Sequence, residues 1–65
     1  MQLIVNGESR HTTASTLAEV LDELGYHGAS VATALNGVFV AQSARATRAL
    51  AEGDALEILA PMQGG

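Results

Sequence analysis

Apolar residues recur along this chain in short stretches at strand spacing, separated by residues that favour turns. Asn6-Gly7 and Asn36-Gly37 each stand between two such stretches. The Asn-Gly pair favours a tight hairpin because both of its residues accept a positive φ angle. Together with Pro61, which stops the last stretch, the pattern predicts five strands, over residues 2–6, 8–13, 31–35, 38–40 and 55–60.

One stretch has helical spacing instead. Thr16 and Glu19 match a capping box, in which the side chain of each residue accepts a hydrogen bond from the backbone N–H of the other. Gly25 stands where the helix would end, since glycine readily takes the left-handed conformation. Between these signals, four apolar residues at i, i+3, i+4 and i+7 form one stripe, namely Leu17, Val20, Leu21 and Leu24.

The order of these elements indicates a two-layer α+β fold. One main helix is available to cover one face of a mixed sheet, and an irregular or partly helical segment over residues 41–52, anchored by Leu50, crosses to the last strand. We expect residues 1–60 to form a single domain and residues 61–65 to form a flexible C-terminal tail. The apolar stripe of the helix should pack on a sheet containing Leu3, Val5, Leu35 and Ile58.

Composition and charge narrow the range of functions. The 65 residues include no cysteine, which removes thiolate chemistry and is simplest to reconcile with a reducing cytoplasm. Seven acidic residues against three arginines give a net charge of −4, which opposes binding to nucleic acid. The first residues lack the features of a signal peptide, and no apolar run reaches membrane-spanning length. We therefore expect a cytoplasmic chain with neither nucleic acid nor membrane as a partner.

Candidate catalytic groups are few. His11, in a predicted strand, and His27, in a predicted loop, have no thiol or lysine to act with, so we interpret both as surface residues. The hydroxyl residues at 12, 13, 15 and 16 coincide with the helix start, and capping accounts for them. The carboxylates at 19, 22, 23, 52, 54 and 57 are spread over predicted surfaces without the spacing of a metal site. We predict no catalytic residue and no metal in this chain.

The C-terminal residues offer a different kind of functional group. Gly64-Gly65 follows the last strand and Pro61, and a backbone without Cβ atoms can enter a narrow channel. The residues from Pro61 onward would reach about 17 Å if fully extended. An ordinary frayed terminus is also favoured by glycine, so Gly-Gly alone is weak evidence. The terminal carboxylate of Gly65 nevertheless combines exposure with useful chemistry.

Over its full length the chain resembles the ThiS family, the sulfur carriers of thiamine biosynthesis, which have the ubiquitin-like β-grasp fold. The resemblance rests on several motifs in order, none of them specific alone. These are MQLIVNGE at 1–8, the helix at 16–24, the stretch 31–37 that ends in Asn-Gly, LAEGD at 50–54, LEI at 56–58 and the terminal Gly64-Gly65.

The resemblance implies that this chain is a carrier and cosubstrate and not itself an enzyme. The ionised carboxylate of Gly65 is a poor electrophile, and in this family an E1-like adenylating enzyme of the ThiF type activates it with ATP and Mg²⁺. A sulfur donor protein then leaves a thiocarboxylate on Gly65, and thiazole synthase of the ThiG type receives the sulfur. Gly64 and Gly65 would be recognised in the tail, and this chain would bind no cofactor of its own.

Two positions depart from the family pattern, both in the crossing segment. Ala41-Gln42 stands where the family often has Pro-Arg, and Arg45 stands where an aromatic residue is often found. Both positions bear on which partner surface is used and leave the tail chemistry intact. For that surface, strand alternation places Leu59, with Ile4 beside it, away from the helix as apolar residues that a partner would cover.

Proteins with other functions also end in Gly-Gly. Molybdopterin-synthase-type small subunits and carriers for other sulfur metabolites use the same chemistry, although the short chain and the Asn-Gly pattern favour thiazole. A ubiquitin-like modifier would join Gly65 to lysines of target proteins. A plain docking domain would make no use of the carboxylate. The sequence leaves these alternatives open.

Overall fold

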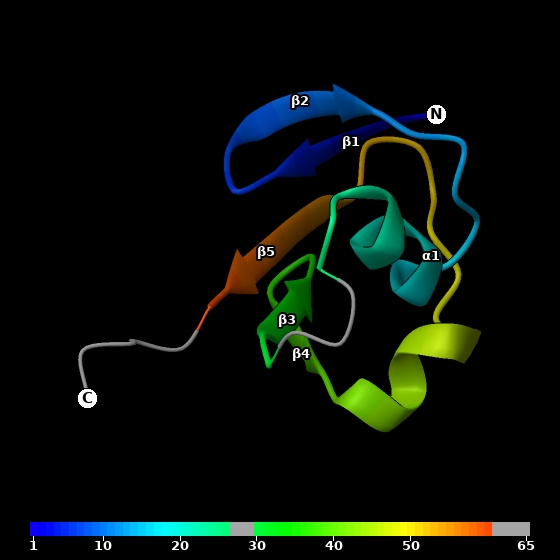
Figure 1. Ribbon diagram of the computed structural model, residues 1–65. Helices are drawn as coiled ribbons and strands as arrows, with labels where there is room; N and C mark the ends of the chain where they lie inside the picture. The colour runs from blue at the N-terminus through cyan, green and yellow to red at the C-terminus, as the bar shows by residue number, and fades with distance from the viewer. Residues whose placement is uncertain (27–29, 61–65) are drawn as a thin grey trace.

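A mixed sheet forms one layer of the molecule, and an α-helix lies on one of its faces (Figure 1). The computed structural model describes residues 1–26 and 30–60, so the predicted tail at 61–65 lies outside the described residues. The elements in chain order are β1 (Gln2–Val5), β2 (Glu8–His11), α1 (Leu17–Glu23), β3 (Ala32–Leu35), β4 (Val38–Val40), the 3₁₀ helix η1 (Gln42–Thr47) and β5 (Ala55–Leu59). The predicted α+β class and order of elements are confirmed.

The five strands lie in the order β2-β1-β5-β3-β4, which puts the last strand in the middle of the sheet. β5 pairs in parallel with β1 and antiparallel with β3, and each of these two neighbours forms an antiparallel hairpin with its outer strand. Both hairpins turn at the predicted Asn-Gly pairs. Asn6 and Asn36 have φ angles of 49° and 52°, which asparagine tolerates better than other residues with a side chain.

The helix begins as its sequence predicts. Glu19 N–H donates to Thr16 Oγ1 at 3.3 Å, and Thr16 N–H donates to Glu19 Oε1 at 3.2 Å, which completes the capping box. At the other end Gly25 takes a φ of 92°, which stops the helix. Leu24, predicted to share the apolar stripe, lies at the cap and is only partly buried, whereas the rest of the stripe is fully buried.

The core lies between α1 and the sheet. All four predicted sheet positions are buried, and the helix stripe packs with them in one cluster of apolar side chains. Because full burial of one leucine stabilises a fold by about 1.5–3 kcal/mol, this cluster supplies most of the stability of so small a domain. Leu56, on the same face of β5 as Ile58, is also fully buried. The predicted anchor Leu50 joins the same cluster from the crossing segment.

The crossing segment contains η1 and is fastened to the start of the helix. Leu17 N–H donates to the carbonyl of Arg48 at 3.0 Å, and Leu50 N–H donates to the carbonyl of Ser15 at 2.9 Å. A short bridge between Thr16 and Ala49 connects the same two segments. The N-terminal end of the helix is thereby fixed to the crossing segment.

Candidate functional site

The predicted working group, Gly65, and its neighbour Gly64 lie outside the described residues. The structure does describe the strand from which the tail begins. Leu59, the last residue of β5, pairs with Ala32 of β3, so β5 remains in register with its neighbour to its final residue. In Figure 1 the end of β5 points away from α1. The tail therefore starts from the central strand of the sheet.

Large apolar side chains lie exposed on the sheet face opposite the helix. Leu59 is 71% exposed, Phe39 69% and Ile4 43%. The strand neighbours of Ile4, the residue before Leu59, and Val40 next to Phe39 are buried on the other face, whereas Val38, on the edge strand, is 60% exposed. Ala34 pairs with Phe39 on one side and with Glu57 on the other, so a small residue separates the aromatic ring from a carboxylate. We call this surface the open face; it consists of Ile4, Phe39, Glu57 and Leu59 with their strand partners Ala32, Ala34 and Ala55.

The predicted exposure of Ile4 and Leu59 is confirmed, and their role as a partner surface stays a prediction. The expectation that Ile4 lies beside Leu59 was wrong, because Ile4 pairs with Ala55 at the start of β5 and Leu59 is the last residue of that strand. Phe39 was missing from that predicted surface. The sequence places Phe39 and Val40 on opposite faces of one strand, and the structure shows that Val40 is buried, which directs Phe39 outward. A strand of three residues is too short for alternation alone to decide which of its faces is buried.

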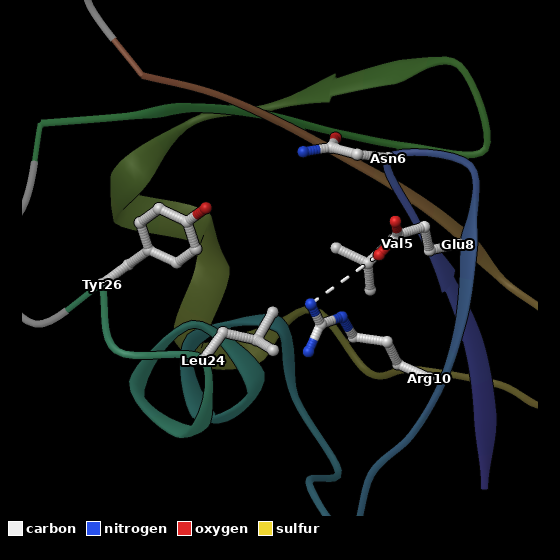
Figure 2. A pocket seen from close by; sticks show the side chains of 6 residues that line it. All are labelled: Val5, Asn6, Glu8, Arg10, Leu24 and Tyr26. Carbon is white, nitrogen blue, oxygen red and sulfur yellow. Dashed lines mark ion pairs between the residues drawn. The ribbon is translucent and has the colours of Figure 1, made fainter.

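A small hollow lies between the β1–β2 hairpin and the C-terminal end of α1 (Figure 2). Its volume is about 140 Å³, and Leu24 and Tyr26 face the hairpin residues across it. Glu8 and Arg10 form an exposed ion pair within it at 3.8 Å, so each neutralises the other. Neither a nucleophile with an adjacent base nor an unpaired charge is among the side chains that line this hollow, which gives no support for catalysis there.

Glu23 and Glu19 are held by hydroxyl residues and backbone groups near the helix. Thr12 and Thr13 donate their hydroxyls to the two carboxylate oxygens of Glu23, and the Thr12 hydrogen bond is the main cause that lowers the pKa of Glu23. Ser15 N–H donates to Glu19 at 2.7 Å and lowers the pKa of that carboxyl. Capping thus explains the hydroxyl at 16, and the Ser15 side chain interacts with Glu19 of the same capping box. The prediction that capping explains the hydroxyls at 12 and 13 was wrong, because they bind Glu23.

Two of the other carboxylates accept hydrogen bonds from the backbone. Glu52 accepts from Gln2 N–H, and Asp54 accepts from Ala51 N–H in the turn before β5. Across residues 1–26 and 30–60, no three His, Asp or Glu side chains are grouped to hold a metal ion. Within the same residues no helix is long and apolar enough to span a bilayer. His11 is exposed at the end of β2, and His27 lies outside the described residues.

Arg45 lies inside the molecule rather than on a partner surface. Its side chain donates from Nε to Thr33 Oγ1 at 3.1 Å and from Nη2 to the carbonyl of Val31 at 2.6 Å. The residue is 8% exposed. Arg45 therefore fastens η1 to β3, and its departure from the family's aromatic residue concerns the packing of the crossing segment. The expectation that Arg45 bears on the choice of partner surface is corrected accordingly.

The sequence of this chain is similar to proteins of the ThiS family. The chain matches the sequence model of the ThiS family over residues 3–65. It is 41% identical over 61 residues to the sulfur carrier protein ThiS of Thermus thermophilus, a match that covers 94% of this chain and 95% of that protein. It is also 42% identical over 66 residues to a thiazole synthase of Paramagnetospirillum magneticum. That match takes in all of this chain, which spans only 20% of the length of the synthase.

Comparisons with solved structures agree. The crystal structure of the thiamine biosynthesis protein ThiS from Geobacter metallireducens superposes with a TM-score of 0.82 at 33% identity, with all of both chains covered. The solution structure of a thiamine biosynthesis protein from the same organism gives 0.80 at 30% identity, over all of this chain and 88% of the other. The expected ubiquitin-like β-grasp fold is thereby confirmed.

Proposed function

We propose a detailed function from the premise that this chain belongs to the ThiS family, as its match over residues 3–65 and its 41% identity to a curated sulfur carrier show. The chain is a sulfur carrier protein of thiamine biosynthesis. The proposal concerns how it carries sulfur, from which atom, and to which partner. It assigns the catalysis to partner enzymes, for which this chain is a cosubstrate.

In the proposed reaction the carboxylate of Gly65 is the working group. One of its oxygens attacks the α-phosphorus of ATP in an adenylating enzyme of the ThiF type, and pyrophosphate leaves with Mg²⁺ assistance. Sulfur at the sulfide level, released by a sulfur donor protein, then attacks the acyl carbon and breaks its bond to AMP, which leaves a thiocarboxylate on Gly65. Activation is needed because an ionised carboxylate is a poor electrophile at neutral pH. Sulfur has no other place on this chain, because the sequence contains no cysteine.

The observation that carries this proposal is the extent of the family match. It runs to residue 65, so the family pattern includes Gly64-Gly65 as well as the folded domain. The position of β5 adds support, because the tail starts from a strand that is paired on both sides near the centre of the sheet. A fixed origin with a glycine end suits delivery of one carboxylate into a narrow channel.

Two partners follow from the same proposal. Thiazole synthase of the ThiG type would receive the sulfur, and the 42% identity to part of a protein that is named a thiazole synthase supports this pairing. We assign the open face to the contact with the adenylating enzyme, because Leu59 is exposed at the end of β5, where the tail starts, and Phe39 is exposed on the same face of the sheet. A cytoplasmic site of action is part of the proposal and rests on the lack of cysteine.

Mass spectrometry of the protein purified from its native host tests the proposal. We expect a fraction of molecules in which one oxygen of the Gly65 carboxylate is replaced by sulfur. A peptide with Gly65 joined to a lysine side chain would instead identify a protein modifier. A carboxylate that is never altered, in cells that are making thiamine, would leave only a docking domain and would overturn the carrier chemistry.

A further inference from the structure

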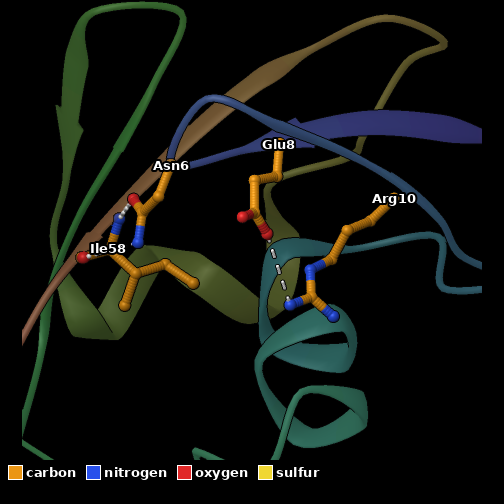
Figure 3. A network of polar contacts seen from close by, with 4 residues as sticks. All are labelled: Asn6, Glu8, Arg10 and Ile58. Carbon is orange, nitrogen blue, oxygen red and sulfur yellow. Dashed lines mark hydrogen bonds and ion pairs between the residues drawn. The ribbon is translucent and has the colours of Figure 1, made fainter.

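The side chain of Asn6 forms two hydrogen bonds with the backbone of a single residue near the end of β5. Ile58 N–H donates to Asn6 Oδ1 at 2.8 Å, and Asn6 Nδ2 donates to the carbonyl of Ile58 at 3.2 Å (Figure 3). The amide group thus uses a donor and an acceptor together, as a neighbouring strand does. Ile58 lies only two residues before Ala60, the last described residue ahead of the tail.

These bonds continue the sheet at a point where β1 has ended. β1 pairs with β5 only through Ala55 and Leu56, and the last main-chain bond on that edge runs from Asn6 N–H to the carbonyl of Leu56 at 2.9 Å. The chain then turns away into β2. Without the Asn6 side chain, the last part of β5 would be held on one edge only, by β3.

A matching arrangement exists at the other end of the same strand. Ala55 N–H donates to Asn36 Oδ1 at 2.9 Å, and Asn36 Nδ2 donates to Asp54 Oδ1 at 2.9 Å. Asn36 and Asn6 are both exposed, and both begin an Asn-Gly turn with a positive φ angle. Glycine would satisfy such a turn equally well. The two asparagine side chains therefore do more than form turns, since they hold β5 at its start and near its end.

We propose that Asn6 is a positioning residue for the reaction at the C-terminus. It contacts no reacting atom, and it acts through Ile58 by fixing the place and direction in which the chain leaves the sheet. This inference rests on the proposed function of the tail. A fixed origin reduces the number of tail conformations that must be lost when a partner enzyme captures the terminus. Asn36 is the matched control, because it fixes the end of β5 that lies away from the tail.

The test compares Asn6→Gly with Asn36→Gly, since both changes keep the turn and each removes one pair of side-chain hydrogen bonds. Hydrogen exchange of the Ile58 and Leu59 amides should become faster in Asn6→Gly and stay at the parental rate in Asn36→Gly. ATP–pyrophosphate exchange is then measured with the cognate adenylating enzyme while the carrier concentration is varied. We expect Asn6→Gly to raise KM about tenfold with little change in kcat, since the lost order must be restored on binding.

Equal KM values for the two variants, with a parent chain that is active, would overturn the role of Asn6 and leave the carrier function standing. A parent chain that supports no exchange would overturn the carrier function itself, and with it this inference. If Asn6→Gly does not fold, Asn6→Asp takes its place, because aspartate tolerates the positive φ and accepts from Ile58 N–H but cannot donate when ionised. Its KM should rise in the same direction, and a parental KM would again overturn the proposal.

Discussion

The two faces of the sheet both carry large apolar side chains, yet only one of them is covered. On the helix side Leu3 and Leu56 are fully buried, whereas on the open face Leu59 and Phe39 are about 70% exposed. Covered apolar surface stabilises the fold by leaving water, and exposed apolar surface contributes nothing of this kind until another molecule covers it. Substitutions on the helix side should therefore lower stability, whereas substitutions on the open face should lower the affinity for a partner.

The largest loss of stability is expected on the covered face. Leu21→Ala removes a buried side chain from the centre of the helix stripe and should lower the free energy of unfolding by about 2–5 kcal/mol. In so small a domain this is a large part of the total. Denaturant unfolding followed by circular dichroism measures the change. An unchanged midpoint would show that the helix side is not the stabilising face.

A smaller loss of stability is expected when the buried side chain of Arg45, which joins η1 to β3, is removed. Arg45→Ala removes the donor to the partly buried carbonyl of Val31 and one of the two hydrogen bonds of the Thr33 hydroxyl, and a buried acceptor left without a donor costs about 1–3 kcal/mol. Thermal unfolding should show a lower melting temperature. Arg48→Ala, which removes the same charge from a neighbouring exposed position, is the control and should melt close to the parent. Equal melting of the two variants would place Arg45 on the surface.

On the open face the effect on stability should be small and the effect on binding large. Leu59→Asp should change the free energy of unfolding by no more than about 0.5 kcal/mol, as is usual for exposed positions. Its affinity for the adenylating enzyme should fall, because a charge would be buried against an apolar partner surface. Ser43→Asp adds the same charge at an exposed position of η1, which packs against α1 rather than on the open face, as a control. Calorimetric titration that finds equal affinities would remove Leu59 from the interface.

The smallest effect concerns the polar contacts at the edge of the helix. Because the Thr12 hydroxyl lowers the pKa of Glu23 in the folded chain, ionised Glu23 stabilises the fold at pH values above the ordinary pKa of a carboxyl group. This contribution is lost as the pH falls through the lowered pKa. Glu23→Gln should therefore be less stable than the parent at neutral pH and equal to it in acid. A stability difference that does not change with pH would contradict this role.

The elements with local signals were predictable from sequence. Thr16 and Glu19 lie three residues apart, and the helix stripe repeats within two turns, so both signals can be found in one short window. Contacts between distant residues were not predictable. The Asn6 amide reaches Ile58 across 52 positions, and Arg45 reaches Thr33 across 12, so each contact depends on how the whole sheet is assembled. The Asn-Gly signal predicted the turn and gave no information about what its side chain would bind.

The same limit applies to the candidate site. The sequence predicted Gly65, Leu59 and Ile4, and the structure confirms that the last two are exposed. Phe39 joined them only when the burial of Val40 was known. The proposed chemical role belongs to Gly65 in the tail. Its assignment depends on the sequence and on the family match, which extends to residue 65, and not on the described structure.

The division between a stabilising domain and a reactive tail is tested most directly by ATP–pyrophosphate exchange with a chain that lacks Gly65. Removal of one residue draws the carboxylate back by about 3.5 Å, and displacement by about 1 Å from a reactive geometry can cost on the order of 100-fold in rate. We expect the shortened chain to melt at the temperature of the parent and to support no exchange with the cognate adenylating enzyme. Exchange at the parental rate would contradict the assignment of Gly65 as the working group.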